Sequence, residues 1–592
     1  MTTDQNYQQI YRVGGMLDAG FVGQITYTIS LDQVYDELDI HFSFDKRLYS
    51  ESDITPELID RLQTLCTAKY NAPTYPVEEF RQTILHEMKT EIHTMAELND
   101  NFIGCIHRQL TDRHMLYTKE FTIDGCLAQD TFSGVLKVTV LVFNVLLNNT
   151  QYTLTVSGHP VGQGVIAPNF NLMDTVKTAA GNAGASNAAE SADNSCDAES
   201  APASAGSSGV SGAGSAATAG DSGVSGAGSA AAAGDSSTTG SSSAGNTVTA
   251  STRFKRLELH NHTVESDGSL TCQELTEYLA ADHVDAFAIT DHNTTSGQKK
   301  IEQLLEEKHY PISLIRGMEY TTYFGHILCL NLAKYVPWNS IDQHRPELLF
   351  EAAREKGALV GIAHPFSYGD PFARGCRFEM TISDYSKVDF IEIFNNPEPL
   401  HEVNERGTNL WMSLIFSGYQ ITATSGMDLH NRAKLAGCYA TYIEGKNGGN
   451  IASELDTAIH THRTWVSKGA LLLTEVLPET NELLLTFTDA HKTGFAVSKT
   501  AQVVLKGKDK TFTTSVSLDK PVRVSLNQLS GTDPIIPLLY EAASDSCVNA
   551  AAASTSCSNT SDASSAAGQL KGIDALPAIE GLLCVSPVLY RD

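Results

Sequence analysis

The stretch that decides the fold reads Leu257-Glu258-Leu259-His260-Asn261-His262-Thr263-Val264-Glu265-Ser266-Asp267-Gly268. Its first residues have strand character, and side chains two apart in a strand point to the same face. His260 and His262 therefore point the same way as the strand ends, which is half of a metal site. Alone, a His-x-His pair also fits an ordinary surface strand. The residues at the other predicted strand ends distinguish the two interpretations.

Short apolar runs and helical patterns alternate after this stretch. The runs lie at 285–290, 312–318, 358–363, 389–394 and 421–425, and each is typical of a buried parallel strand. Between them, Thr271-x-x-Glu274 and Thr295-x-x-Gln298 have the form of helix capping boxes. Strand and helix in alternation over roughly 200 residues predict a βα barrel or a doubly wound sheet.

Imidazoles and carboxylates stand at nearly every one of these strand ends, which is where barrel enzymes gather their chemistry. A single histidine would be interpreted as a core residue, but this repetition indicates a site. Mixed histidine and carboxylate donors without thiolate suit Zn²⁺, Mn²⁺ or Fe²⁺, and there are too many for one ion. After His260 and His262, the candidate residues are Asp267, Asp291, His292, Glu319, His326, His364, Asp428 and His430.

The motifs that carry these residues resemble those of a known superfamily. They are His260-x-His262-Thr263 with Ser266-Asp267-Gly268, Thr290-Asp291-His292-Asn293, Gly317-Met318-Glu319, Ala363-His364-Pro365 and Asp428-x-His430. In this order they are similar to the motifs of the polymerase-and-histidinol-phosphatase (PHP) superfamily of metal-dependent hydrolases. Glu319-Tyr320-Thr321-Thr322 followed by Gly325-His326 is most similar to its CehA/McbA-type branch. The resemblance covers about 255–470, and nothing comparable covers 1–250.

The resemblance implies a distorted (βα)7 barrel that holds two or three divalent ions, Mn²⁺, Zn²⁺ or Fe²⁺. Carried over by position, the first ion would be held by His260, His262, Glu319 and Asp428. Glu319 would bridge to a second ion held with His364 and, as an optional ligand, His326. Asp267, His292 and His430 would form a third site, or complete the second if only two ions bind. Glu319, Asp428 and Asp291 are the expected catalytic residues, with Asp291 orienting its neighbours from behind the ligands.

The leading functional hypothesis is a metal-dependent phosphoesterase. It would hydrolyse a small phosphomonoester, a nucleotide or an oligonucleotide end through a metal-bridging hydroxide. One alternative is an amide or carbamate hydrolase with the same centre, and another is a degenerate barrel that serves as a binding or regulatory module. Arg374, Arg377 and Arg432 follow ligand-bearing segments, where they could clamp a phosphate or be solvated surface charges.

The chain divides by composition. A tract from about Gly181 to Ser251 consists almost entirely of Ala, Gly and Ser, and such a tract cannot bury enough apolar surface to order itself. We therefore expect an α+β domain of unknown role at 1–170, a disordered linker at 171–252, the PHP barrel at 253–470, and a small β-rich carboxy-terminal region at 471–592 with a low-complexity insertion at 542–567.

Within the amino-terminal domain, helices are expected near 55–69 and 76–97. His86-Glu87 followed by Glu91 and His93 is not a zincin motif, because the second histidine lies seven residues on rather than four. We expect these residues to belong to a surface helix with a structural role.

Charge and cysteine usage restrict the partners. The formal charge of −28, from 69 acidic and 41 basic residues, repels a nucleic-acid backbone. General nucleic-acid binding is not expected, whereas a small phosphorylated substrate at a local cationic site is. The 11 cysteines contain no Cys-x-x-Cys pair, and we see neither a secretory signal nor a membrane span. These features predict a cytoplasmic protein and leave its oligomeric state open.

Overall fold

The computed structural model describes residues 7–70, 74–108, 110–161, 253–338, 341–395, 402–446, 448–490, 498–529, 533–542 and 579–590. The predicted linker at 171–252 and residues 543–567 of the predicted insertion lie outside the described residues. Residues 1–168 and 252–592 group as one compact unit.

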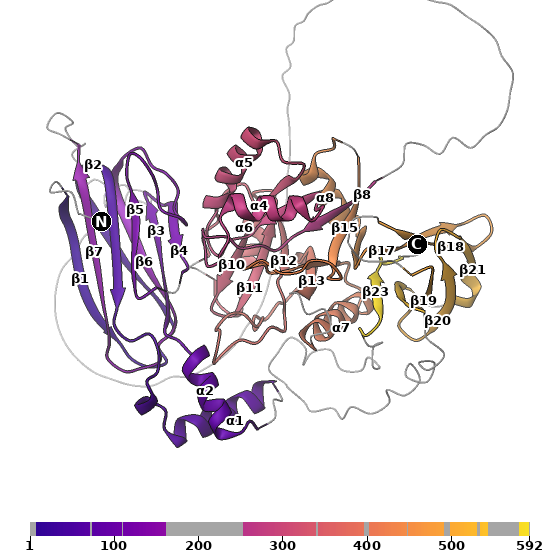
Figure 1. Ribbon diagram of the computed structural model, residues 1–592, viewed down its shortest axis with the longest axis horizontal. Coiled ribbons are helices and arrows are strands. Elements are labelled where there is room, and N and C mark those ends of the chain that lie inside the picture. The colour runs from indigo at the N-terminus through magenta and orange to yellow at the C-terminus, as the bar shows by residue number, and fades with distance from the viewer. Residues whose placement is uncertain are drawn as a thin grey trace, which may run out of the picture. The chain divides into compact units, whose positions relative to one another are not determined.

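The amino-terminal segment forms a seven-stranded antiparallel sheet with two helices (Figure 1). Its strand order is β1-β7-β2-β6-β3-β4, and β5 pairs with β2. Val138, Val140 and Val142 of β6 are fully buried, which fits the preference of β-branched side chains for the middle of a sheet. The elements are β1 (Gln8–Leu17), β2 (Gly23–Phe44), α1 (Pro56–Tyr70), α2 (Val77–Glu87), β3 (Glu91–Leu98), β4 (Asn101–Ile106), β5 (Asp112–Tyr117), β6 (Phe132–Asn144) and β7 (Thr150–Pro160).

The helix expected at 76–97 is wrong in its second half. The helix α2 ends at Glu87, and β3 begins at Glu91. Strand β3 pairs with β6 on one side and β4 on the other, so it lies inside the sheet. Tertiary pairing has overridden a local pattern that also fits a helix. Glu91 and His93 are consequently buried strand residues, and the surface-helix interpretation does not hold for them.

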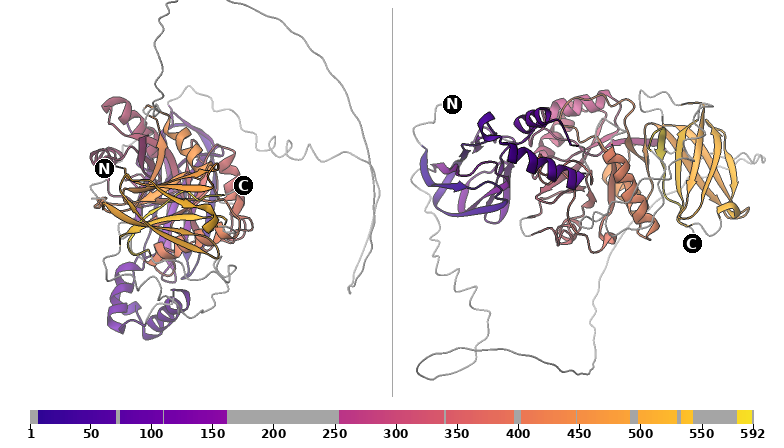
Figure 2. Two further views of the ribbon diagram at one scale, coloured as in Figure 1. Left: turned by 90° about the vertical axis from the view of Figure 1, so that its right-hand side faces the viewer. Right: turned by 90° about the horizontal axis from the view of Figure 1, so that it is seen from below.

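The central segment is a mixed α/β structure (Figure 2). Strands β8, β9 and β10 are parallel neighbours, as are β12, β13 and β14, while β11 runs antiparallel between the two sets. The strands are β8 (Arg253–Glu258), β9 (Ala286–Ile289), β10 (Ser313–Thr322), β11 (Gly325–Leu330), β12 (Leu359–Ile362), β13 (Phe390–Asn395), β14 (Thr422–Gly426), β15 (Ala440–Gly445) and β16 (Thr464–Ser467). The helices are α4 (Cys272–Ala281), α5 (Ser296–Lys308), α6 (Glu347–Arg354), α7 (Glu402–Phe416) and α8 (Ile451–His460).

The structure does not show a closed (βα)7 barrel. The strands belong to a 13-stranded sheet of order β14-β13-β12-β11-β10-β9-β8-β15-β16-β23-β22-β19-β20, which continues beyond the expected barrel into the carboxy-terminal strands. Three more strands form a separate sheet of order β17-β18-β21. The carboxy-terminal strands are β17 (Ala470–Leu477), β18 (Glu482–Asp489), β19 (Thr500–Lys506), β20 (Thr511–Ser517), β21 (Val522–Ser525), β22 (Ile536–Glu541) and β23 (Leu582–Val585).

One of the two expected capping boxes forms. At the start of α4, the Thr271 hydroxyl accepts a hydrogen bond from the Glu274 amide, and the Glu274 carboxylate accepts one from the Thr271 amide. Thr295 precedes α5 but does not cap it with its side chain. Its neighbour Thr294 supplies the oxygen instead, because the Thr294 hydroxyl accepts from the Ser296 amide at 3.2 Å.

The amino-terminal sheet shares a hydrophobic core with the central segment. Met95 and Phe143 belong to the same buried cluster as Met318 and Tyr320. Polar contacts also join the two segments, since the Gly125 amide donates to Glu265 Oε2 at 2.9 Å.

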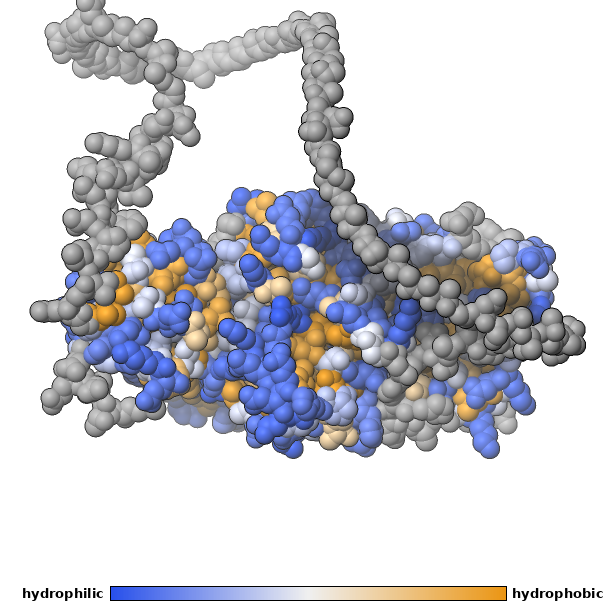
Figure 3. All heavy atoms as spheres, turned by 90° about the horizontal axis from the view of Figure 1, so that it is seen from above, coloured by the Kyte–Doolittle hydropathy of each residue, from blue (hydrophilic) through white to orange (hydrophobic). Residues whose placement is uncertain are grey.

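No helix among the described residues is long and apolar enough to cross a membrane. Hydrophilic residues are interspersed with hydrophobic ones on the face drawn in Figure 3.

Candidate metal centre

Two loops that follow strands are tied together at the centre of the site. One follows β8 and contains His260 and His262; the other follows β14 and contains Asp428 and His430. The His262 amide donates to the Leu429 carbonyl at 3.0 Å, and the Leu429 amide donates to the His260 carbonyl at 3.1 Å. This short parallel pairing brings two pairs of candidate side chains, at least 166 residues apart in the sequence, to one place.

The first group of donors consists of His260, Glu319, His364 and Asp428, whose donor atoms lie within 4.8 Å of one another. His260 Nε2 is 3.3 Å from Glu319 Oε2 and 3.4 Å from Asp428 Oδ1. His364 Nε2 is 3.1 Å from Glu319 Oε1. His260 and Glu319 are fully buried, so the group lies inside the protein.

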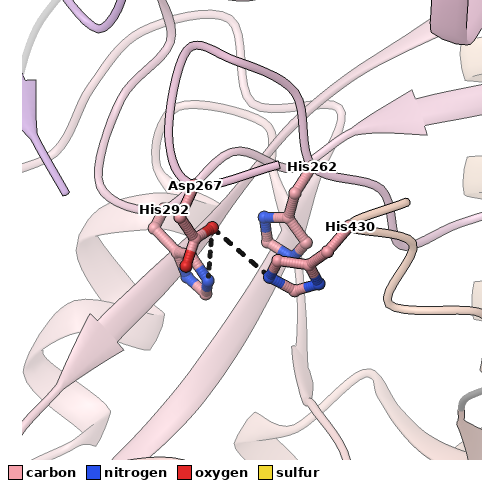
Figure 4. Close-up of side chains that lie close together, drawn as sticks. All are labelled: His262, Asp267, His292 and His430. Carbon is pink, nitrogen blue, oxygen red and sulfur yellow. Dashed lines mark ion pairs between the residues drawn. The ribbon is translucent and has the colours of Figure 1, made fainter. Parts of the chain in front are cut away.

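The second group consists of His262, Asp267, His292 and His430 (Figure 4). Asp267 Oδ1 lies 3.6 Å from His292 Nε2 and 3.3 Å from His430 Nε2. The His262 ring stacks against both His292 and His430, with 4.2 Å between ring centroids in each case. His262 thus groups with the set expected for a third ion rather than with His260. Its Nε2 is still 3.0 Å from Asp428 Oδ1, which places it between the two groups.

Glu319 connects these groups through its two carboxylate oxygens. Oε2 faces His260, His262 and His292 at 3.3, 3.4 and 2.9 Å. Oε1 faces His326 Nδ1 at 2.9 Å and His364 Nε2 at 3.1 Å. His292, Glu319 and His326 form a third set of converging donors. A carboxylate surrounded in this way has the arrangement of a ligand shared between two ions.

The donor atoms fit divalent ions. Several of them are buried and have no hydrogen-bond partner among the described residues, although buried polar atoms are normally paired. Bound cations would satisfy those of these atoms that converge, and imidazole with carboxylate is a donor set that suits Zn²⁺, Mn²⁺ and Fe²⁺. The atoms are His260 Nε2, His262 Nδ1 and Nε2, Asp267 Oδ1, Glu319 Oε2, His326 Nε2, His364 Nδ1 and Asp428 Oδ1.

The buried charges stabilise one another in the absence of ions. Burial by itself would raise the pKa of Glu319, but the imidazoles of His260, His326 and His292 hold it well below its usual range. Burial opposes protonation of His260, yet Glu319, Glu392 and Asp428 hold the pKa of its imidazole well above the ordinary value. Burial, together with His430 and His292, lowers the pKa of His262 to about 3. The metal-free site therefore already contains both charged and neutral imidazoles.

Asp291 lies outside the donor groups and supports the loop that contains them. Its Oδ1 accepts hydrogen bonds from the Thr263 amide at 2.7 Å and the Ser266 hydroxyl at 2.6 Å, and Oδ2 accepts one from the Thr263 hydroxyl at 2.8 Å. Burial raises the pKa of Asp291 to about 6, against the effect of these hydrogen bonds. The contacts fix the turn between His262 and Asp267.

The sequence interpretation missed Glu392 of β13. Its carboxylate oxygens lie 3.1 and 3.2 Å from His260 Nδ1, and Oε2 also accepts from the His364 amide at 3.0 Å. Glu392 thereby orients one ligand side chain and the backbone of another, in the manner of a carboxylate behind a metal-bound histidine. The signal was present as a carboxylate in the middle of the apolar strand Phe390-Ile391-Glu392-Ile393-Phe394.

Replacing Glu392 by glutamine is expected to weaken metal binding by about 10–100-fold, the usual effect of removing such a support. Glutamine keeps the size of the side chain but removes the charge that faces His260 Nδ1. The measurement is a metal titration of the stripped protein by calorimetry, with Glu444→Gln of β15 as the matched control. Unchanged affinity in Glu392→Gln would show that His260 is oriented without it.

The three arginines considered as phosphate clamps make other contacts. Arg374 Nη2 is 2.8 Å from Asp370 Oδ1, so its charge is already paired. The Arg377 guanidinium lies over the rings of Tyr70 and Phe366, each at 5.4 Å. Arg432 lies over the Tyr278 ring at 5.7 Å. Each of the three guanidinium groups thus has a partner outside the donor groups.

The amino-terminal sheet also reaches the centre, which the sequence did not indicate. His107, directly after β4, stacks on the His292 ring with 4.2 Å between centroids, and its Nε2 is 3.7 Å from Asp267 Oδ2. The Arg108 side chain donates to the Ser266 carbonyl at 3.2 Å. These contacts depend on how the amino-terminal sheet packs against the central segment, so the sequence alone does not predict them.

Comparison with known proteins gives matches to parts of the chain. The profile of a family described as a family of unknown function (DUF6669) matches residues 7–160. The uncharacterized protein MJ1587 of Methanocaldococcus jannaschii is 30% identical over 112 residues, which are 19% of this chain and 58% of that protein. The 5′-3′ exoribonuclease of Haemophilus influenzae is 36% identical over 141 residues, 22% of this chain and 50% of that protein. The chain thus spans about half the length of the curated relatives it matches.

A solved structure gives a further match. It is described as a two-domain protein from Bacteroides vulgatus containing a predicted PHP-like metal-dependent phosphoesterase. It is 15% identical, with a TM-score of 0.30 over 49% of this chain and 90% of the other. None of these descriptions names the CehA/McbA-type branch.

Proposed function

We propose that this protein is a metal-dependent phosphoesterase with a distorted PHP barrel of the CehA/McbA type. It would act on a small phosphomonoester, a nucleotide or an oligonucleotide end, with two or three ions of Mn²⁺, Zn²⁺ or Fe²⁺. The observation that carries this proposal is Glu319, a fully buried carboxylate with imidazole donors on both oxygens. The exoribonuclease relative is a reason to include oligonucleotide ends.

Bound divalent ions would lower the pKa of water and offset the charge of a phosphoryl group. The residues of this chain would position those ions and the water. Glu319, which is buried, and Asp428, which is partly exposed, supply negative charge between the imidazoles. Glu392 orients His260, and Asp291 fixes the turn that ends in Asp267. Burial of the ligands lowers the local dielectric response and so strengthens these electrostatic interactions.

The test is a substrate panel on the full-length protein. Phosphomonoesters, nucleotides, short oligonucleotides with a terminal phosphate, and aryl carbamates are assayed with added Mn²⁺ or Zn²⁺, with Asp428→Ala as the inactive reference. We expect hydrolysis of at least one phosphoester and loss of it in Asp428→Ala. Hydrolysis of carbamates alone would favour the amide and carbamate alternative. A fully metal-loaded protein that hydrolyses nothing in the panel would favour a binding module.

A further inference from the structure

A second set of buried metal donors lies in the amino-terminal sheet, next to the centre already described. It consists of Glu91, His93 and His107, whose donor atoms lie within 4.8 Å of one another. Glu91 and His93 are two apart in β3, so they point to the same face. Because Thr94 is registered with Ile106, His107 follows β4 at the level of His93 on the neighbouring strand. Sheet pairing therefore brings the three side chains together.

These side chains are buried and incompletely satisfied. Glu91, His93 and His107 are all buried. Glu91 Oε1 lies 3.0 Å from His93 Nε2, and the two imidazole rings stack with 3.9 Å between centroids. Among the described residues, neither His93 Nδ1 nor His107 Nδ1 has a hydrogen-bond partner. An unpaired buried imidazole nitrogen costs free energy, and a bound cation would remove that cost.

The set continues into the main centre through Asp267. His107 Nε2 is 3.7 Å from Asp267 Oδ2, while Asp267 Oδ1 faces His292 and His430. The two oxygens of this carboxylate therefore face different groups. Two imidazoles and one carboxylate are also a donor set found in zinc sites that keep a position open for another ligand.

We propose that Glu91, His93 and His107 bind an additional divalent cation, preferably Zn²⁺. The amino-terminal sheet then supplies a metal site of its own at the edge of the hydrolase centre. This inference does not depend on the proposed phosphoesterase activity, because it concerns metal content alone.

The experiment counts ions in the full-length protein. Wild type, Glu91→Gln and His93→Ala are stripped with a chelator, reloaded with Zn²⁺, freed of loose metal by gel filtration and analysed for zinc per chain. His86→Ala is the matched control, because His86 is exposed on α2 of the same segment. We expect both variants to lose about one zinc per chain, and the control to equal wild type. Asp428→Ala should lose ions independently, so that Asp428→Ala with His93→Ala loses the sum.

A zinc content equal to that of wild type in both Glu91→Gln and His93→Ala would overturn the proposal. Anomalous diffraction at the zinc edge from crystals of the reloaded wild-type protein is a second test, and it does not depend on whether the variants fold. A peak bounded by Glu91, His93 and His107 is the expected result. Peaks at the main centre with none among these three side chains would overturn the proposal, whatever the protein hydrolyses.

Discussion

Replacing Glu319 by glutamine is expected to lower phosphoester turnover by at least about 10²–10³-fold, the scale of losing one well-placed electrostatic contact in an active site. Glutamine has nearly the same size, but one carboxylate oxygen becomes an NH₂ group, which donates hydrogen bonds and cannot bind a cation. Both oxygens of Glu319 face imidazoles, so either orientation of the amide removes a ligand from one side. The measurement is kcat/KM on the best substrate of the panel, with zinc or manganese content determined on the same samples.

The matched control is Glu479→Gln, the same chemical change at an exposed position between β17 and β18. It should retain wild-type turnover and metal content. If Glu319→Gln also retains both, Glu319 does not hold ions and the proposed function loses its main support. Lost turnover with full metal content would instead mean that the ions are held without Glu319 and that its role lies in positioning water.

The candidate centre was largely accessible from the sequence because one local rule applies to most of its parts. Most candidate donors lie at or just after the end of a short apolar strand, and the ends of neighbouring strands meet in space. His260 and Asp428 illustrate this, since they are 168 residues apart yet their donor atoms are 3.4 Å apart. His326 is an exception, because it lies at the start of β11. The division of the donors into groups could not be predicted from the sequence, because it depends on the orientations of the imidazole rings. His262 Nε2 lies 3.0 Å from Asp428 Oδ1 and its ring stacks on His292, which the two-residue spacing from His260 does not indicate.

The residues that the sequence did not reveal are positioned by long-range pairing. Glu392 acts from the middle of β13, and only the neighbouring strands show that its carboxylate reaches His260. His93 and His107 meet through the register of β3 and β4, whereas the local pattern around His93 also fits a helix. The sequence analysis predicted a distorted (βα)7 barrel, and the structure agrees with it only at the level of a mixed α/β structure. The antiparallel β11 and the extension through β15 and β16 have no local signal.

Removing the metal from wild-type protein is expected to abolish hydrolysis reversibly and to lower the midpoint of thermal unfolding. An ion present at one hundred times its Kd stabilises the folded state by about 2.7 kcal/mol. At an unfolding entropy of about 2.1 cal/mol/K per residue, this corresponds to roughly 3 °C in a protein of this size. The apoprotein keeps its fold because Glu319 and the imidazoles around it stabilise one another as charges. The measurement is turnover and thermal unfolding of stripped protein before and after each metal is restored. An inactive protein that regains nothing on reloading would contradict a catalytic role for the ions.

The same experiment has a pH dependence whose sign follows from His260. In the metal-free protein burial opposes the imidazolium, but Glu319, Glu392 and Asp428 hold its pKa well above the ordinary value, so this histidine carries a proton at neutral pH. An ion that binds at Nε2 must displace that proton, and metal affinity therefore rises with pH up to the pKa of His260 in the metal-free protein. The expected slope is about tenfold in Kd per pH unit for each proton displaced. Calorimetric titrations in buffers of different ionisation enthalpy measure the protons released. Binding that is independent of pH between 6 and 8, with no proton release, would mean that the ions bind without displacing the His260 proton.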